Sequence, residues 1–151
     1  MKPGIQIKNG KFKFQEFPEN EIGLAKYCNS FQLELNDIRM IAISPRLAVD
    51  DETLFILVID KDGKIFPIPD NVLKSIGIKT FEAHFQLKSI VEEWEKFDYN
   101  DHYGKYDKVI YPCEHYWKDL FKNDWKLKVR QFYSWANPKS FFGNLNKENV
   151  G

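Results

Sequence analysis

The segment that most constrains the fold is Leu54–Ile59, six consecutive apolar residues that form the most hydrophobic run in the chain. Six residues without a polar break predict a central strand that is covered on both faces. The next segment, Asp60–Lys64, contains an Asp-Gly pair, which is a strong hairpin signal, and it leads into Ile65–Ile68. Pro67 has no amide hydrogen, so we expect the returning strand to lie at a sheet edge or to contain a bulge there.

Four further strands are predicted before this hairpin. Ile5–Gln15 alternates apolar and polar residues on both sides of an Asn-Gly pair, which favours a type I′ turn and a short hairpin. Phe31–Leu35 also alternates, which predicts a strand with one buried face. Ile38–Ile43 is a mostly apolar run that we expect to end at Ser44-Pro45.

After residue 70 the apolar pattern changes to a helical period. We expect a short helix from Asp70 or Asn71 to Ile76, ended by Gly77, and a helical turn over Thr80–Phe85. The clearest helix carries an apolar stripe that should pack on the sheet, formed by Leu87, Ile90, Val91, Trp94 and Phe97. Its opposite side is charged and predicts a solvated face, formed by Lys88, Glu92, Glu93, Glu95 and Lys96.

The last third of the chain gives mixed signals. Val109–Tyr111 predicts a short strand before Pro112, and residues 114–123 predict a helix. Residues 125–135 favour a helix, with a strand over Lys126–Arg130 as the alternative. We therefore expect one α+β domain over residues 1–151, in which helices pack on an antiparallel sheet. Residues 1–70 would form the sheet, residues 71–143 the helical, aromatic-rich part, and residues 144–151 a frayed tail.

Charge and hydropathy exclude several classes of protein. The 151 residues include 22 basic and 22 acidic side chains, so the chain has no overall electrostatic reason to bind nucleic acid. The sequence has no apolar run near 18 residues, and we expect no transmembrane segment. The first residues, Met1–Gly4, do not resemble a secretory signal. We therefore expect a cytoplasmic protein in which Cys28 and Cys113 are reduced.

Residues with catalytic or metal-binding chemistry are present, but their spacing is unfavourable. The loop that begins at Asp98 does not match the ligand positions of a calcium-binding loop, and the three histidines lack zinc-site spacing. No serine or glycine motif indicates a nucleophile or a phosphate site. We therefore expect no catalytic residue, no metal and no cofactor. The alternative is a small enzyme that uses Cys113 and His115, or the Asp98–His102 region.

Aromatic residues are the most informative feature of the last third. Half of the 24 Phe, Tyr and Trp residues lie within positions 101–151. One interpretation is that Trp117, Phe121 and Trp125 cover the sheet as core residues. The other is that exposed aromatics bind a protein partner, and the predicted partner-binding residues are Tyr103, Tyr106, Tyr111, Tyr116 and Trp135. The leading hypothesis is a non-catalytic intracellular protein that forms a stoichiometric protein–protein complex, for example an immunity protein that inhibits a toxin.

Part of the chain, Phe31–Phe97, resembles bacterial pleckstrin-homology-like modules. The similarity lies in Leu35–Ile41, in the hairpin Leu54–Ile68 with its Asp-Gly-Lys turn, and in the amphipathic helix that follows. Such modules lack catalytic residues, so the resemblance assigns none here. It implies a second alternative function, binding to a membrane surface or a lipid, with basic residues in the first hairpin that would be Lys8, Lys11 and Lys13.

Overall fold

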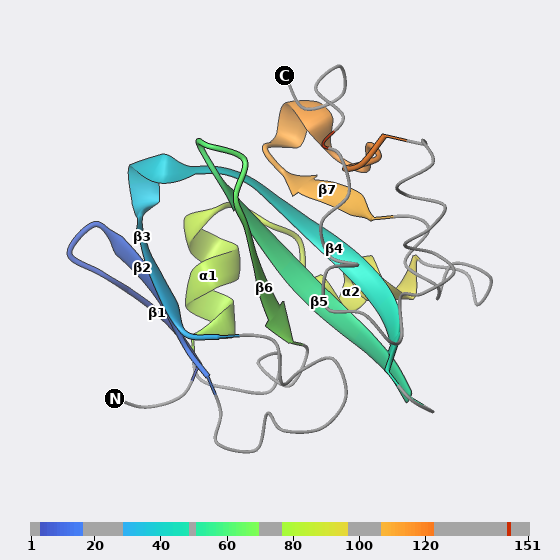
Figure 1. Ribbon diagram of the computed structural model, residues 1–151, viewed down its shortest axis with the longest axis horizontal. Coiled ribbons are helices and arrows are strands. Elements are labelled where there is room, and N and C mark those ends of the chain that lie inside the picture. Colours follow the sequence, from blue (N-terminus) through green and yellow to red (C-terminus); the bar gives the residue numbers. More distant parts are fainter. Residues whose placement is uncertain are drawn as a thin grey trace.

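The computed structural model describes residues 4–16, 29–48, 51–69, 77–96, 107–122 and 145. The described elements are, in chain order, β1 (Gly4–Lys8), β2 (Lys11–Gln15), β3 (Phe31–Glu34), the 3-10 helix η2 (Leu35–Asp37), β4 (Ile38–Ala48), β5 (Asp51–Asp60), β6 (Ile65–Pro69), α1 (Ile78–His84), α2 (Ile90–Glu95), β7 (Lys108–Tyr111) and the 3-10 helix η5 (Cys113–His115). The strands form two antiparallel sheets, ordered β1-β2-β3 and β6-β5-β4-β7 (Figure 1). The predicted α+β class is confirmed.

The first hairpin folds as its sequence predicts. Asn9 and Gly10 connect β1 to β2 with φ values of 54° and 75°, the positive values that a type I′ turn requires. Phe12 and Phe14 on β2 point inward and are fully buried, and Lys11 and Lys13 lie on the opposite face. The period-two pattern of this segment therefore corresponds directly to one buried and one wet sheet face.

The apolar run of β5 is covered on both faces, as predicted. Ile56 and Val58 belong to a core cluster shared with the first sheet and both helices. Phe55 and Leu57 point to a second cluster on the other face, where Leu120 covers them. Five consecutive β5 residues, 55–59, have no exposed surface. The most hydrophobic segment of the sequence is therefore the strand that both core clusters share.

β6 is the edge strand that Pro67 predicted. Asp60 N–H donates to the Lys64 carbonyl at 3.0 Å, so these two residues form a hydrogen-bonded pair at the start of the β5–β6 ladder. Because hydrogen bonding alternates along an antiparallel strand, Phe66 and Ile68 bond to β5, and Pro67 turns its nitrogen away from it. No bulge is needed, because the position without an amide hydrogen faces outward.

β4 runs further than predicted, and the expected end at Ser44-Pro45 is wrong. Its pairing with β5 continues to Ala48, with Pro45 opposite Leu54. The main-chain groups of successive β5 residues point alternately toward β6 and β4. Because those of Asp60 point toward β6, those of Phe55 point toward β4, and Phe55 forms a hydrogen-bonded pair with Ser44. Pro45 then points its nitrogen away from β5. A proline at such a position does not interrupt the ladder.

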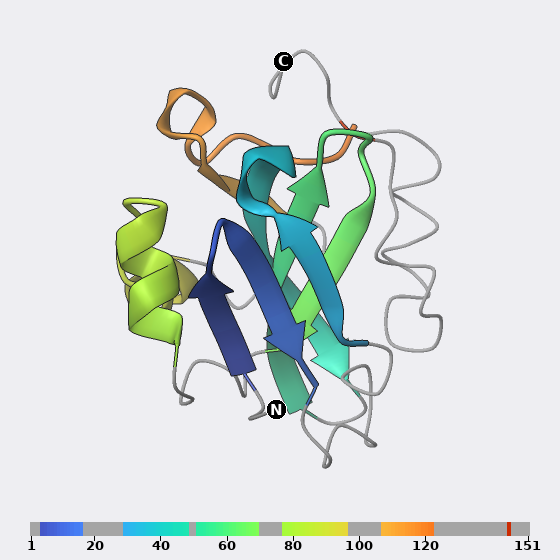
Figure 2. The same ribbon diagram turned by 90° about the vertical axis from the view of Figure 1, so that its left-hand side faces the viewer.

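α1 confirms the predicted helical turn over Thr80–Phe85 and begins slightly earlier. It lies beside β1, and its Phe81 ring packs 5.6 Å from that of Phe12 (Figure 2). Gly77 precedes this helix with φ of 105°, and its backbone lies against the carbonyl of Ile5. The earlier helix that Gly77 is expected to end, over residues 70–76, lies outside the described residues.

α2 begins at Ile90 rather than at Leu87, and its predicted faces are partly wrong. Ile90 is buried and Trp94 is partly buried, as expected. Val91, however, is 51% exposed, and Glu93, expected on the solvated face, is 1% exposed. The helix therefore turns Glu93 rather than Val91 toward the core, because the Glu93 carboxylate accepts a hydrogen bond from Tyr116, which follows β7 in the chain.

The predicted helix over residues 114–123 is wrong, whereas the strand at Val109–Tyr111 is confirmed as β7. The chain forms η5 and then returns along the free edge of β7, where Trp117 N–H donates to the Val109 carbonyl at 2.7 Å and Leu120 N–H to the Asp107 carbonyl at 2.9 Å. These bonds use main-chain groups that an intact helix would bond internally. Residues 123–144, including the predicted helix over 125–135, lie outside the described residues.

Neither of the α-helices that the structure describes is long and apolar enough to cross a membrane.

Candidate functional site

Two of the five predicted partner-binding residues lie within the described chain, and both are partly buried. Tyr111, at the end of β7, packs its ring 5.1 Å from that of Phe85. Tyr116 follows η5, and its ring centroid lies 5.8 Å from that of Trp117. The other three predicted residues lie outside the described ranges and are Tyr103, Tyr106 and Trp135.

The carboxylate of Glu93 is the centre of a polar cluster that connects α2 to the turn after η5. The Tyr116 hydroxyl lies 2.6 Å from Glu93 Oε2 and 2.9 Å from Oε1, and it donates to the carboxylate. Lys96 Nζ lies 3.3 Å from Oε1 and also donates to the Tyr116 hydroxyl oxygen. A buried charge is costly unless it is paired and hydrogen-bonded. These two partners are why α2 can bury an acidic residue.

The electrostatics of the cluster favour the charged form of Lys96. The hydrogen bond to Tyr116 is the main cause that raises the pKa of Lys96 above its ordinary value, and the hydrogen bond and charge of Glu93 act in the same direction. Partial desolvation of the ammonium group lowers the pKa and offsets part of this rise. Lys96 is charged at neutral pH with or without this rise, and its hydrogen bonds to Glu93 and Tyr116 connect the end of α2 to the turn after η5.

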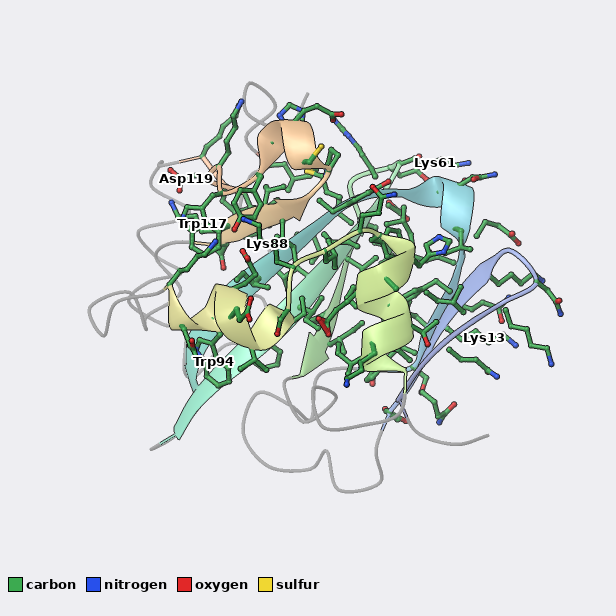
Figure 3. The ribbon with its side chains drawn as sticks, turned by 180° about the vertical axis from the view of Figure 1, so that it is seen from behind. Lys13, Lys61, Lys88, Trp94, Trp117 and Asp119 are labelled. Atoms are coloured by element: carbon green, nitrogen blue, oxygen red, sulfur yellow. The ribbon has the colours of Figure 1, made fainter. Side chains whose placement is uncertain are left out.

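Two lysines lie against the aromatic rings of this turn. Lys88 Nζ lies 4.7 Å and Lys96 Nζ 4.9 Å from the centroid of the Tyr116 ring, and Lys96 is also 5.1 Å from the Trp117 ring. These distances are within the range of cation–π attraction. Figure 3 shows Lys88 next to Trp117, with Lys13 and Lys61 on the far side of the molecule. We refer to Lys88, Glu93, Lys96, Tyr116 and Trp117 as the Tyr116 cluster.

Trp117 adopts a backbone conformation that is rare for a bulky residue. Its φ is 65°, in the left-handed region, which costs about 1–2 kcal/mol for a residue with a side chain. Its amide bonds to Val109 on β7, so the conformation keeps Trp117 both on the sheet edge and beside Lys96. Strained conformations of this kind persist where the surrounding structure requires them, and they concentrate at binding sites.

The hydrogen bond between Tyr116 and Glu93 should be measurable as a coupling energy. We expect Tyr116→Phe to lower the free energy of unfolding by about 1–3 kcal/mol, because it leaves the buried Glu93 carboxylate without its main donor. The double variant with Glu93→Gln should cost at least about 1 kcal/mol less than the sum of the two single variants, as measured by urea denaturation. Tyr111→Phe is the control, and we expect a change within about 0.5 kcal/mol. Additive effects of Tyr116→Phe and Glu93→Gln would contradict the coupling.

Sequence patterns could not identify this cluster. Glu93, Lys88 and Lys96 all lie on the side of the helix that the apolar stripe marks as solvated. The residue that makes burial of Glu93 favourable is Tyr116, 23 positions later. The one available signal was the density of aromatic residues in the last third of the chain, which predicted Tyr116 but not its acidic partner.

The alternative functions involve other places in the described structure. Cys113 is an exposed free thiol in η5, and His115 of the same turn is partly buried, while the Asp98–His102 region lies outside the described residues. Within the described ranges, no group of three His, Cys, Asp or Glu side chains is placed to hold a metal ion. Lys8 lies opposite Lys11 in the first hairpin.

No family model, no curated protein and no solved structure matches this chain. The resemblance of Phe31–Phe97 to pleckstrin-homology-like modules therefore stays a prediction from sequence patterns.

Proposed function

We propose that this chain is a non-catalytic intracellular binding protein that forms a stoichiometric complex with another protein through the Tyr116 cluster. An immunity-type inhibitor is one kind of protein that works in this way. The observation that carries the proposal is the strained backbone of Trp117, which holds a partly exposed indole beside Tyr116 and beneath a lysine.

The chemistry of the cluster fits a protein surface better than a small substrate. The Tyr116 hydroxyl proton is engaged by Glu93, so it is not available as a general acid. Tyrosine and tryptophan supply large contact areas at little entropic cost and dominate binding energies at protein interfaces. Here hydrogen bonds and cation–π contacts fix the Tyr116 ring in advance, which reduces the entropic cost of binding.

Lys88 indicates the charge of the partner. Its side chain is exposed, its ammonium group lies over the Tyr116 ring, and no carboxylate among the described residues forms an ion pair with it. Lys96, in contrast, is already neutralised by Glu93. A carboxylate on the partner would therefore pair with Lys88 while an apolar or aromatic group covers the adjacent rings.

The experiment is affinity capture from native cell extract with the full chain, followed by mass measurement of the isolated complex. We expect one protein to be captured at a one-to-one ratio. Lys88→Glu should reduce its capture at least about tenfold, because the change places a negative charge against the partner's carboxylate. The matched control is Lys79→Glu, which makes the same charge change at an exposed position on α1.

Two outcomes of the capture experiment would contradict the proposal. If Lys88→Glu and Lys79→Glu capture the same proteins in the same amounts, the Tyr116 cluster is not the binding surface. If no protein is captured at a fixed ratio, the proposed function is wrong.

A further inference from the structure

The two sheets have four edge strands, and three of these edges are closed to another strand. The edge of β1 is occupied at Ile5 by the backbone of Gly77 and by α1. The edge of β7 carries the returning chain, through bonds to Val109 and Asp107. On the edge of β6 the nitrogen of Pro67 faces outward, and because proline has no amide hydrogen it cannot donate to another strand.

The remaining edge, that of β3, presents complete peptide groups. Leu35 N–H donates to the Gly10 carbonyl at 2.9 Å, and this bond shows which residues of β3 form hydrogen-bonded pairs with β2. Alternation then turns Leu33 and Phe31 toward β2 and turns the N–H and C=O groups of Gln32 and Glu34 outward. Within the described part of the chain, nothing hydrogen-bonds to these two outward peptide groups.

The apolar side chains of β3 are also incompletely covered. Phe31 and Leu33 point to the same core as Phe12 and Phe14 of β2, but they are only partly buried, whereas the two β2 residues are fully buried. The Phe31 ring stacks on that of Phe66 from β6 at 4.7 Å. The edge of β3 therefore combines outward main-chain N–H and C=O groups with apolar side chains that are only partly covered on the core face of the sheet.

We propose that β3 is a docking edge to which an extended segment of a partner protein adds as a fourth, antiparallel strand of the first sheet. In Figure 2, β6 extends past the outer side of β3 on the inner side of this sheet. A second copy of this chain, related by a two-fold axis, would bring its own β6 into the same space. A single extended segment avoids that clash and lies over Phe66.

The surroundings of the edge define the segment's chemistry. The inward side chains of the added strand would contact Phe31, Leu33 and Phe66, so every second residue should be apolar. Its outward side chains would lie opposite Gln32 and Glu34, which are both exposed. Glu34 Oε1 lies 4.0 Å from Lys11 Nζ of β2, and both side chains are exposed, so this ion pair is weak. A lysine or arginine directly opposite Glu34 on the added strand would form a second pair that competes with it. The segment that fits is an alternating apolar and basic sequence.

This docking edge does not depend on the Tyr116 cluster. The cluster would bind an acidic surface, whereas the β3 edge would bind a basic strand. Loss of Lys88 would leave β3 unchanged, so failure of the proposed function and failure of this inference can be distinguished.

The probe is a fluorescein-labelled nine-residue peptide of alternating lysine and valine, added to the full chain and followed by fluorescence anisotropy. We expect saturable binding. The same peptide N-methylated at its lysines should bind at least about tenfold more weakly, because in an antiparallel pair those amides face Gln32 and Glu34. Amide hydrogen exchange at Gln32 and Glu34 should slow when the unmodified peptide is added, and exchange at Leu33, already bonded to β2, should not change.

Two substitutions at Gln32 separate main-chain pairing from side-chain contact, and a third, at Glu34, tests the charge preference. Gln32→Pro removes only an outward amide hydrogen, as Pro67 does in β6, and should weaken peptide binding about tenfold. Gln32→Ala keeps the amide and should bind within about twofold of the wild type. Glu34→Lys should reverse the preference toward a peptide of alternating glutamate and valine. The NMR spectrum of each variant shows whether its fold is retained.

Equal binding by the N-methylated and unmodified peptides would overturn the proposal, and so would equal binding by folded Gln32→Pro and Gln32→Ala. Absence of saturable binding by the lysine–valine peptide would overturn it as well.

Discussion

Replacing Phe12 with alanine is expected to lower the free energy of unfolding by about 3–5 kcal/mol. Phe12 has no exposed surface, and its ring lies 5.8 Å from Phe31, 5.6 Å from Phe81 and 6.5 Å from Phe85. It therefore joins the first sheet to α1, and a cavity at this position would loosen contacts on both sides. Urea denaturation of the full chain measures the effect through the shift of its midpoint.

Val91 provides the control for the Phe12 variant. It is apolar but 51% exposed, so Val91→Ala should change stability by no more than about 0.5 kcal/mol. If Phe12→Ala also falls within that range, then Phe12 does not hold the sheet and helix together as the structure indicates.

Gly77→Ala is expected to destabilise the protein by about 3 kcal/mol or more, which is large for the addition of one methyl group. A Cβ atom at this position would lie 1.9 Å from the carbonyl oxygen of Ile5, which is main chain and cannot rotate away. The φ of 105° adds conformational strain for any residue with a side chain. α1 would have to move away from β1 to accommodate the methyl group.

Gly10→Ala separates these two causes. Gly10 also has a positive φ, 75°, but no atom lies within 4 Å of the position that a Cβ atom would occupy there. We expect a loss of only about 1–2 kcal/mol, measured by the same denaturation experiment. Equal losses for the two variants would show that the contact with Ile5 contributes nothing.

Local patterns predicted the strands better than the helices. The Asn-Gly turn, the run Leu54–Ile59 and the edge position of Pro67 each depend on chemistry within a few residues, and each prediction is confirmed. Pro45 wrongly predicts a strand end, because the sequence does not reveal which way the proline nitrogen points. The register with β5 decides that, and the register forms only in the folded sheet.

The candidate site was only partly predictable for a related reason. Burial of Glu93 depends on Tyr116 and Lys96, and a helical period treats an acidic residue as a solvated position whatever lies beside it in space. Similarly, the segment after Cys113 has helical spacing, but the edge of β7 offers its main-chain groups alternative hydrogen bonds. Tertiary partners decided both outcomes.

The pairing of β4 with β7 has a consequence for synthesis of the chain. Ala42 pairs with Val109, so the four-stranded sheet remains incomplete until the ribosome has made and released the segment near residue 111. Phe55 and Leu57 also lack their cover on one face until Leu120 has been made. Between the synthesis of Leu57 and that of Leu120, nascent chains therefore expose apolar side chains of β5, and chaperones that bind such surfaces would have access to them during this interval.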